Sequence, residues 1–351
     1  EPPRIIGRDD ISLEFVEGLM SGVGATARLM RITGPRGSGK TVLLCDLRDR
    51  AIELGWKAVV VSAGPRLSHD LMEQIQDQLT FSSASLGVNV GIASAKLDIS
   101  SSEMSLRAKL KQIAQGSKGL FIAVDEVQDA PVEEMRIIAS TVQLLIGEKA
   151  NIALAFAGLP SGVMDLINGK ALTFLRRAVP EDLVPINQIE IALSLSDSFN
   201  ATGLSLDGDL LSKAARATKG YAYLVQLVGY SIWQRANLHR EKSTLVSERD
   251  VDEGILLAEA RFHDVVHEPA ISGLSRNEIN YLYAMCEDSR QSKTSDLAKR
   301  LGKKTSELSS VRAKLLSREV IQAPQRGYVQ FAVPDLDEYL KDNRDEILSR
   351  Y

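Results

Sequence analysis

The chain has 351 residues, of which 44% are hydrophobic and 25% charged, a composition that excludes a wholly disordered protein and predicts two or three domains. Its two cysteines, Cys45 and Cys286, lie far apart, which argues against a disulfide framework or a zinc module and favours a reducing, cytoplasmic location. No apolar run approaches the ~20 residues needed to cross a bilayer, so we expect no membrane partner.

The net charge of −4 is unevenly distributed along the chain. Residues 290–330 carry ten Lys or Arg and three acids, a balance of +7 that leaves −11 for the remainder. A basic block on an acidic body predicts a polyanionic partner for that end of the chain.

Short apolar strands alternate with amphipathic helices in the first half of the chain. Strands are expected at residues 29–33, 57–62, 120–124, 152–156 and 186–191, and helices at 42–54, 68–79, 103–115 and 131–145. The Ser/Gly-rich stretch 82–102 predicts a hairpin-like insertion or a mobile loop. The alternation predicts an α/β fold, a three-layer αβα sandwich with a parallel sheet.

After residue 191 the strand signals stop, and helical periodicity at 194–201, 208–218, 221–236 and 247–263 predicts a small helical domain. Residues 263–272 read as a linker broken by Pro269. Beyond it we expect helices at 275–286, 294–301, 305–318 and 336–348, and strands at 320–323 and 328–332. Three helices followed by a two-stranded wing are typical of a winged helix-turn-helix. The predicted domains are 1–191, 192–268 and 269–351.

Residues 34–41 match the pattern G-x-x-x-x-G-K-[ST] and lie between a predicted strand and a predicted helix. Glycines let the backbone wrap around phosphates, so that N–H groups and the helix N-terminus face the anion. Lys40 is expected to reach the β- and γ-phosphates, and the Thr41 hydroxyl to ligate Mg²⁺. The residues expected to hold ATP or ADP are Gly34, Pro35, Arg36, Gly37, Ser38, Gly39, Lys40, Thr41 and Val42.

A second motif is expected at the end of another strand. The apolar run 120–124 is followed by Asp125 and Glu126. Asp125 is expected to hold Mg²⁺, and Glu126 to polarise the attacking water. The alternative is that both are simply an exposed acidic pair at a strand end.

With these two motifs the sequence resembles the AAA+ and STAND branches of the P-loop ATPases, in particular the origin-recognition type of replication initiator. The resemblance covers nearly the whole chain and implies an ATPase core, a helical lid and a C-terminal winged helix. Residues 6–8 look like the segment that opens such domains, which implies that Gly7 and Arg8 pack against the adenine.

At three places the sequence departs from the motifs of this family or matches them only in part. The strand at 152–156 ends in residues 157–160 without the polar sensor residue that many family members place there. Residues 174–178 resemble the segment that donates an arginine finger to a neighbouring copy, which implies Arg176 or Arg177 and a homo-oligomer; the alternative is that both pair with nearby acids. Residues 219–224 resemble the G-x-P motif with Ala222 in place of proline. The weak sensor set implies slow hydrolysis and a switch.

The helix expected at 305–318 would bury Leu308, Val311, Leu315 and Leu316 on one stripe. Small polar side chains on its other face would let it approach duplex DNA closely. The residues expected to contact DNA are Lys303, Lys304, Ser306, Ser309, Ser310, Lys314 and Arg326.

Three functions follow from these patterns. The leading hypothesis is a cytoplasmic ATPase switch that couples nucleotide state to DNA binding through the winged helix. The second is a STAND-like signalling ATPase whose winged helix docks on protein or inhibits its own core. The third is a nucleotide-holding scaffold that barely hydrolyses ATP.

Overall fold

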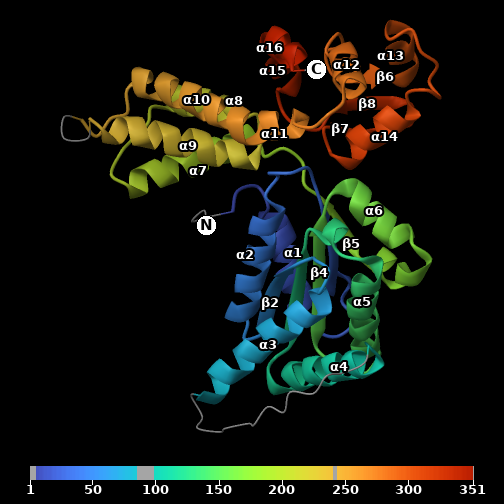
Figure 1. The fold of residues 1–351 in the computed structure, drawn as a ribbon. Coiled ribbons are helices and arrows are strands. Elements are labelled where there is room, and N and C mark those ends of the chain that lie inside the picture. Colours follow the sequence, from blue (N-terminus) through green and yellow to red (C-terminus); the bar gives the residue numbers. More distant parts are fainter. Residues whose placement is uncertain (1–4, 85–98, 240–242, 351) are drawn as a thin grey trace. The chain divides into compact units, whose positions relative to one another are not determined.

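A computed structural model of the chain describes residues 5–84, 99–239 and 243–350 (Figure 1). The chain forms two compact units, one of residues 1–34 and 39–183 and the other of residues 35–38 and 184–351. Residues 85–98, the middle of the expected insertion at 82–102, lie outside the described residues, whereas 82–84 and 99–102 are helical. None of the helices in the described ranges is long and apolar enough to cross a membrane. The three domain boundaries proposed from the sequence stay predictions.

The first unit is built on a sheet of five parallel strands in the order β2-β3-β4-β1-β5. The strands are β1 (Leu29–Thr33), β2 (Lys57–Ser62), β3 (Leu120–Asp125), β4 (Ile152–Gly158) and β5 (Val179–Asp182). Because all five run the same way, their carboxyl ends share one edge of the sheet.

Helices cover both faces of this sheet, as Figure 1 shows. They are α1 (Asp9–Met20), α2 (Lys40–Glu53), α3 (Leu67–Ala84), α4 (Ile99–Gly116), α5 (Val132–Gly147) and α6 (Pro160–Asn168). Short 3₁₀ turns, η1 (Thr26–Arg28), η2 (Val127–Asp129) and η3 (Lys170–Arg177), complete the unit.

The alternation of side chains along β3 explains the layers. Phe121 and Ala123 pack with α1 and α2 in one core cluster, whereas Ile122 and Val124 pack with α3, α4, α5 and α6 in another. Strands buried on both faces are typical of parallel sheets with helices on each side. The three-layer αβα sandwich predicted from the sequence is confirmed.

The strand expected at residues 186–191 is wrong. The fifth strand is Val179–Asp182, and α7 (Gln188–Ala201) already begins inside the expected range. The Asn187 side chain accepts a hydrogen bond of 2.8 Å from the Ile189 amide and so caps that helix. Ile189 itself is 70% exposed, so the isoleucines of this run do not mark a buried strand.

Helices dominate the start of the second unit: α7, α8 (Gly208–Ala217), α9 (Ala222–Asn237) and α10 (Glu248–Phe262). The linker expected at 263–272 is wrong, because a π-helical turn, η4 (His263–His267), and α11 (Glu268–Ile271) continue from α10. Pro269 lies directly after the π-helical turn, near the start of α11, and does not break the run of helical residues.

The rest of the second unit, which we name the C-terminal domain (residues 272–350), alternates helices with very short strands. Its elements are α12 (Arg276–Met285), β6 (Ser292–Lys293), α13 (Thr294–Arg300), α14 (Ser309–Ser317), β7 (Ile321–Gln322), β8 (Tyr328–Phe331), α15 (Leu336–Asp342) and α16 (Arg344–Ser349). The strands form an antiparallel sheet in the order β6-β8-β7.

This element order is the one expected of a winged helix, with three corrections. The two residues of β6, which pair with β8, were not expected as a strand. The helix expected at 305–318 begins only at Ser309, so Ser306 lies in the turn before it. The final helix is two helices, because Asn343 at φ −105° interrupts it.

His267 is a fully buried histidine at the end of η4. Its Nε2 lies 2.7 Å from the Pro334 carbonyl oxygen, and its Nδ1 has no hydrogen-bond partner. A proton added at Nδ1 would therefore be buried without an acceptor. Burial is the main cause that lowers the pKa of His267 from its ordinary value near 6.5 to about 4.

This lowered pKa predicts a pH-dependent stability. Between pH 6.5 and 4 the unfolded chain binds a proton at His267 that the folded chain rejects, so the free energy of unfolding should fall by about 3 kcal/mol as the pH drops through that window. Urea unfolding at several pH values measures this loss. His267→Gln should remove it, whereas His239→Gln, at an exposed position, should keep it; equal losses in both variants would contradict the assignment.

Candidate functional site

The loop between β1 and α2 has a backbone that only glycine adopts easily. Gly37 and Gly39 have φ values of +74° and +94°, in the left-handed region. Gly39 is also the N-cap residue of α2, and no side chain caps the first N–H groups of that helix. The buried Ser38 hydroxyl oxygen likewise lacks a hydrogen-bond partner. Uncapped amides and an orphaned hydroxyl at a helix N-terminus fit a bound phosphate.

Lys40 spans this loop. Its side chain is nearly buried, at 4% exposure, and its Nζ donates a 3.0 Å hydrogen bond to the Gly34 carbonyl oxygen. An ammonium group that is out of water needs anionic or carbonyl oxygens around it. The next two residues, Thr41 and the half-buried Val42, lie in the first turn of α2.

Thr41 and Asp125 meet although they are 84 residues apart in the sequence. The Thr41 hydroxyl donates a 2.5 Å hydrogen bond to Oδ2 of Asp125, and the Glu126 amide donates one of 2.9 Å to Oδ1. Burial raises the pKa of Asp125 above its ordinary value, against the opposing effect of the Thr41 hydrogen bond. A hydroxyl and a buried carboxylate oxygen are hard ligands of the kind that Mg²⁺ prefers, so this pair fits a magnesium ion.

Glu126 is oriented by a residue that the sequence did not reveal. It has φ +52°, and its Oε2 accepts a 2.5 Å hydrogen bond from the Gln128 side-chain amide. The Oε1 of Gln128 in turn accepts a 3.0 Å hydrogen bond from the Leu159 amide, directly after β4. Gln128 thus links Glu126 to the end of β4, where many members of the resembled family place a polar sensor residue. The sequence offered one indication of this role, because Gln128 carries a side-chain amide only two residues after Glu126.

The loop tip, residues 35–38, contacts the turn that precedes α9 within the second unit. The Tyr223 amide donates a 3.2 Å hydrogen bond to the Gly37 carbonyl oxygen. A Cβ atom on Gly37 would lie 2.5 Å from the hydroxyl oxygen of Tyr221, so no larger residue fits there without a shift. Arg36, at the same tip, is exposed.

Gly7 and Arg8 precede α1. Gly7 has φ +66°, and the buried Arg8 donates a 3.2 Å hydrogen bond from its guanidinium to the Gly7 carbonyl oxygen. The Ser12 hydroxyl donates to Asp46 at 2.6 Å, which ties α1 to α2. The two residues therefore lie directly before α1, the helix that is tied to α2 after the loop.

Arg176 and Arg177 differ in their surroundings. The Arg176 guanidinium donates to the carbonyl oxygens of Ile167 (2.8 Å) and Asn168 (3.2 Å), which ties η3 to the end of α6. Arg177 is exposed. Asp182 accepts a hydrogen bond from the Thr33 hydroxyl. Arg176 would have to break its hydrogen bonds to these two carbonyl oxygens before it could act as an arginine finger.

The candidate DNA-contacting residues all lie on the surface of the C-terminal domain. Those exposed are Lys303, Lys304, Ser306, Ser309, Ser310, Lys314 and Arg326. Lys314 keeps 71% of its side chain exposed and approaches Glu278 only at 4.0 Å. Arg326 precedes Gly327 (φ +85°) in the turn between β7 and β8.

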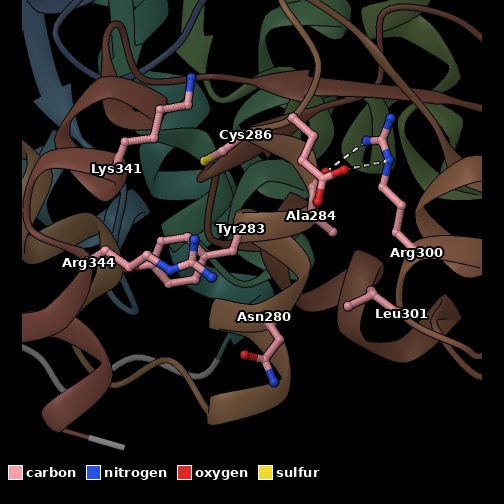
Figure 2. Close-up of a pocket in the computed structure, with 9 residues that line it drawn as sticks. Asn280, Tyr283, Ala284, Cys286, Arg300, Leu301, Lys341 and Arg344 are labelled. Carbon is pink, nitrogen blue, oxygen red and sulfur yellow. Dashed lines mark hydrogen bonds and ion pairs between the residues drawn. The ribbon is translucent and has the colours of Figure 1, made fainter.

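A cavity of about 400 Å³ lies in the same domain, lined by side chains of α12, α13, α15 and α16 (Figure 2). Its Arg300 is held by Asp288 at 2.6 Å and by Glu287 at 3.2 Å, and its Arg344 lies over the ring of Tyr283, 5.2 Å from the centroid. None of the residues expected to bind nucleotide or DNA lines this cavity.

One further group of possible metal ligands exists in the described ranges. His69, Asp70 and Glu73, on the first turns of α3, bring their ligand atoms within 4.8 Å of one another. Asp70 also pairs with Arg66 on the same surface, so we interpret the three residues as part of a solvated helix face.

Two family models match parts of the chain. Residues 24–167 match the AAA domain, and residues 264–340 match a domain of unknown function, DUF8462. The first range contains the glycine loop, Asp125, Glu126 and Gln128. A search of curated proteins found no match.

Solved structures share the fold over nearly the whole chain. A Walker-type ATPase of Pyrococcus abyssi superposes with a TM-score of 0.69 at 14% identity, covering 96% of each chain. The ORC2 protein of Aeropyrum pernix, solved as ADPNP-ADP complexes, gives 0.66 at 14% identity over 99% of this chain and 96% of that one. Cdc6p of Pyrobaculum aerophilum gives 0.56 at 15% identity, with the same coverage.

The geometry predicts that Lys40→Ala removes nucleotide binding. Taking the ammonium away from phosphate charge in a dry loop should cost about 3–5 kcal/mol, which raises the Kd at least ~100-fold. Calorimetry with ATP or ADP measures the change. The control is Lys111→Ala, which breaks a surface ion pair with Glu148 on the same unit and should leave the Kd unaltered. An unchanged Kd in Lys40→Ala would show that the loop does not hold the phosphates.

Proposed function

From the premise that the chain has an AAA domain at residues 24–167 within an origin-recognition-type P-loop fold, we propose that it is an ATP-dependent molecular switch that couples nucleotide state to DNA binding. The observation that carries the proposal is the contact of Thr41 with Asp125 beside the glycine loop. It assembles, from two distant segments, the residue types that ATP hydrolysis needs.

The proposed substrate is MgATP, and the reaction is its hydrolysis to ADP and phosphate. Mg²⁺ supplies charge neutralisation to the phosphates when bound, and Thr41 and Asp125 are the residues that would hold it. Lys40 offsets the negative charge of the β- and γ-phosphates. Glu126 orients the attacking water and accepts its proton, and Gln128 keeps the Glu126 carboxylate in position.

The C-terminal domain supports the DNA-binding half of the proposal by its charge and element order. Its helices α12, α13 and α14 and the strands β7 and β8 follow the order of a winged helix-turn-helix. The exposed face of α14 presents small hydroxyl side chains together with Lys314, and Arg326 lies at the tip of the wing. Small side chains let a helix enter a major groove, and the two cations neutralise phosphates at its borders.

A second candidate, a STAND-like ATPase whose winged helix docks on protein, is favoured by one observation. Lys219, in the turn before α9, forms ion pairs with Asp335 and Glu338 of the C-terminal domain. A domain that already docks on its own chain has the character of an autoinhibitory module.

The exposed Arg177 is the residue that we propose as an arginine finger in a homo-oligomer, since Arg176 is bound to backbone carbonyls. In the part of the chain that the structure describes, Cys45 and Cys286 form no disulfide, which agrees with the cytoplasmic location that we propose.

Glu126→Gln should retain ATP binding and lose turnover by at least the ~10²-fold typical of removing a general base. Phosphate release under saturating ATP measures turnover, and calorimetry measures binding. The matched control is Glu133→Gln, an exposed glutamate paired with Arg136 on the same unit. If turnover survives, another group orients the water; if the unaltered protein shows no turnover, the chain is a nucleotide-holding scaffold.

Lys314→Ala/Arg326→Ala should reduce the salt dependence of DNA binding. Each phosphate contact contributes about 0.9 to the slope of log K against log salt, so the double variant should lose nearly two units. Fluorescence anisotropy of a labelled duplex across a salt series gives the slopes. Lys341→Ala/Arg344→Ala, which removes two cations from the same domain outside α14 and the wing, should keep the slope of the unaltered protein. Identical slopes in all three proteins would reject this DNA interface.

A further inference from the structure

The turn between α8 and α9 is closely packed and hydrogen-bonded, and its backbone suits few other residues. Lys219 and Gly220 both have left-handed φ values, +51° and +77°. A Cβ on Gly220 would lie 2.7 Å from the Ile186 carbonyl oxygen, and the Gly220 carbonyl accepts a 2.8 Å hydrogen bond from the Ile186 amide. The fully buried Thr218 donates its hydroxyl proton to the Ala215 carbonyl at 2.7 Å. Because the turn is packed and bonded at these points, a shift of Lys219 is expected to move its neighbours in the turn with it.

One side of this turn contacts the tip of the phosphate loop. The Tyr223 amide bonds the Gly37 carbonyl, and the Tyr221 hydroxyl fills the space beside the Gly37 Cα. Tyr221 is buried, and burial raises the pKa of its phenol, with Glu319 adding to the effect and Arg36 opposing it.

The other side of the turn holds the C-terminal domain. Lys219 pairs with Asp335 and, at 3.6 Å, with Glu338. The Tyr221 ring meets Phe262 edge-on with centroids 5.6 Å apart, and Phe262 meets His267 in the same way at 4.8 Å. Val333 of the C-terminal domain packs against this aromatic cluster.

A second set of contacts closes the same junction. The His267 ring lies 4.9 Å from that of Tyr339, and its Nε2 donates to the Pro334 carbonyl. The Tyr339 hydroxyl donates a 2.5 Å hydrogen bond to Glu268, which also pairs with Arg350 at 2.8 Å. We name the two ion pairs of Lys219 and these contacts of His267 and Tyr339 the latch.

We propose that the latch regulates the nucleotide site: by holding the C-terminal domain on the Lys219–Tyr221 turn, it preorganises the tip of the phosphate loop through Tyr221 and Tyr223. This inference rests on the proposed function of the loop. A tip that is already held loses less conformational freedom when it binds phosphate, so opening the latch weakens nucleotide binding. By linkage, nucleotide binding strengthens the latch by the same factor.

The test uses a variant that opens the latch without touching the loop. Asp335→Asn/Glu338→Gln removes both charges that face Lys219, and asparagine tolerates the left-handed backbone of Asp335 (φ +56°). The control is Asp337→Asn, which removes a charge from the same helix α15 where it faces Lys341. Calorimetry on the full chain measures the Kd for ADP and for a non-hydrolysable ATP analogue.

The Kd of the latch variant should rise about fivefold or more for at least one nucleotide, the lower range of allosteric couplings, and the control should match the unaltered protein. A Kd that is unchanged or lower for both nucleotides overturns the proposal. Tyr339→Phe, which deletes one hydroxyl and keeps the ring, provides a second opening of the latch if the double variant is poorly folded, and the same outcomes apply. If the unaltered protein binds neither nucleotide, the proposed function itself fails, a result distinct from failure of the latch.

Discussion

The hydrogen bond between Thr41 and Asp125 depends on a single constraint, the parallel direction of the five strands. Parallel strands end at one edge, so the loop after β1 and the acids after β3 come together although 84 residues separate Thr41 from Asp125. The strands β3 and β4 at the centre of this edge are buried along their whole length. Without this sheet, the glycine loop would be an ordinary turn and Asp125 an ordinary surface acid.

Around this contact the site is built mostly from the main chain. Gly37 and Gly39 have positive φ values, and the amides of their loop are the groups that would face phosphate. Glu126 also has a positive φ value, and its amide bonds Asp125. Gln128 adds the one side chain that links Glu126 to the end of β4. Within the second unit, Tyr223 at the start of α9 bonds the loop tip, and Lys219 in the turn before that helix pairs with Asp335 and Glu338 of the C-terminal domain. In our account, nucleotide and DNA states communicate through that turn.

The sequence predicted the features that depend on local patterns. Apolar runs bounded by glycine or acids located four of the five strands of the sheet, and the spacing of Gly34, Gly39 and Lys40 located the loop. The sequence-based predictions failed at positions where tertiary contacts determine the local structure. The run at 186–191 has isoleucines at 186, 189 and 191, but Asn187 caps a helix there. The strand β6 is too short, at two residues, to show any periodicity. Gln128 and the latch depend on contacts between distant segments, for which one sequence carries no periodic signal.

The central claim is that nucleotide state governs the affinity for DNA. Fluorescence anisotropy of a labelled duplex, titrated with the full chain at fixed salt, measures this affinity with ADP and with a non-hydrolysable ATP analogue. The account predicts Kd values that differ by at least about fivefold between the two nucleotides, within the range of measured allosteric couplings. Equal Kd values, or no DNA binding with either nucleotide, would contradict it.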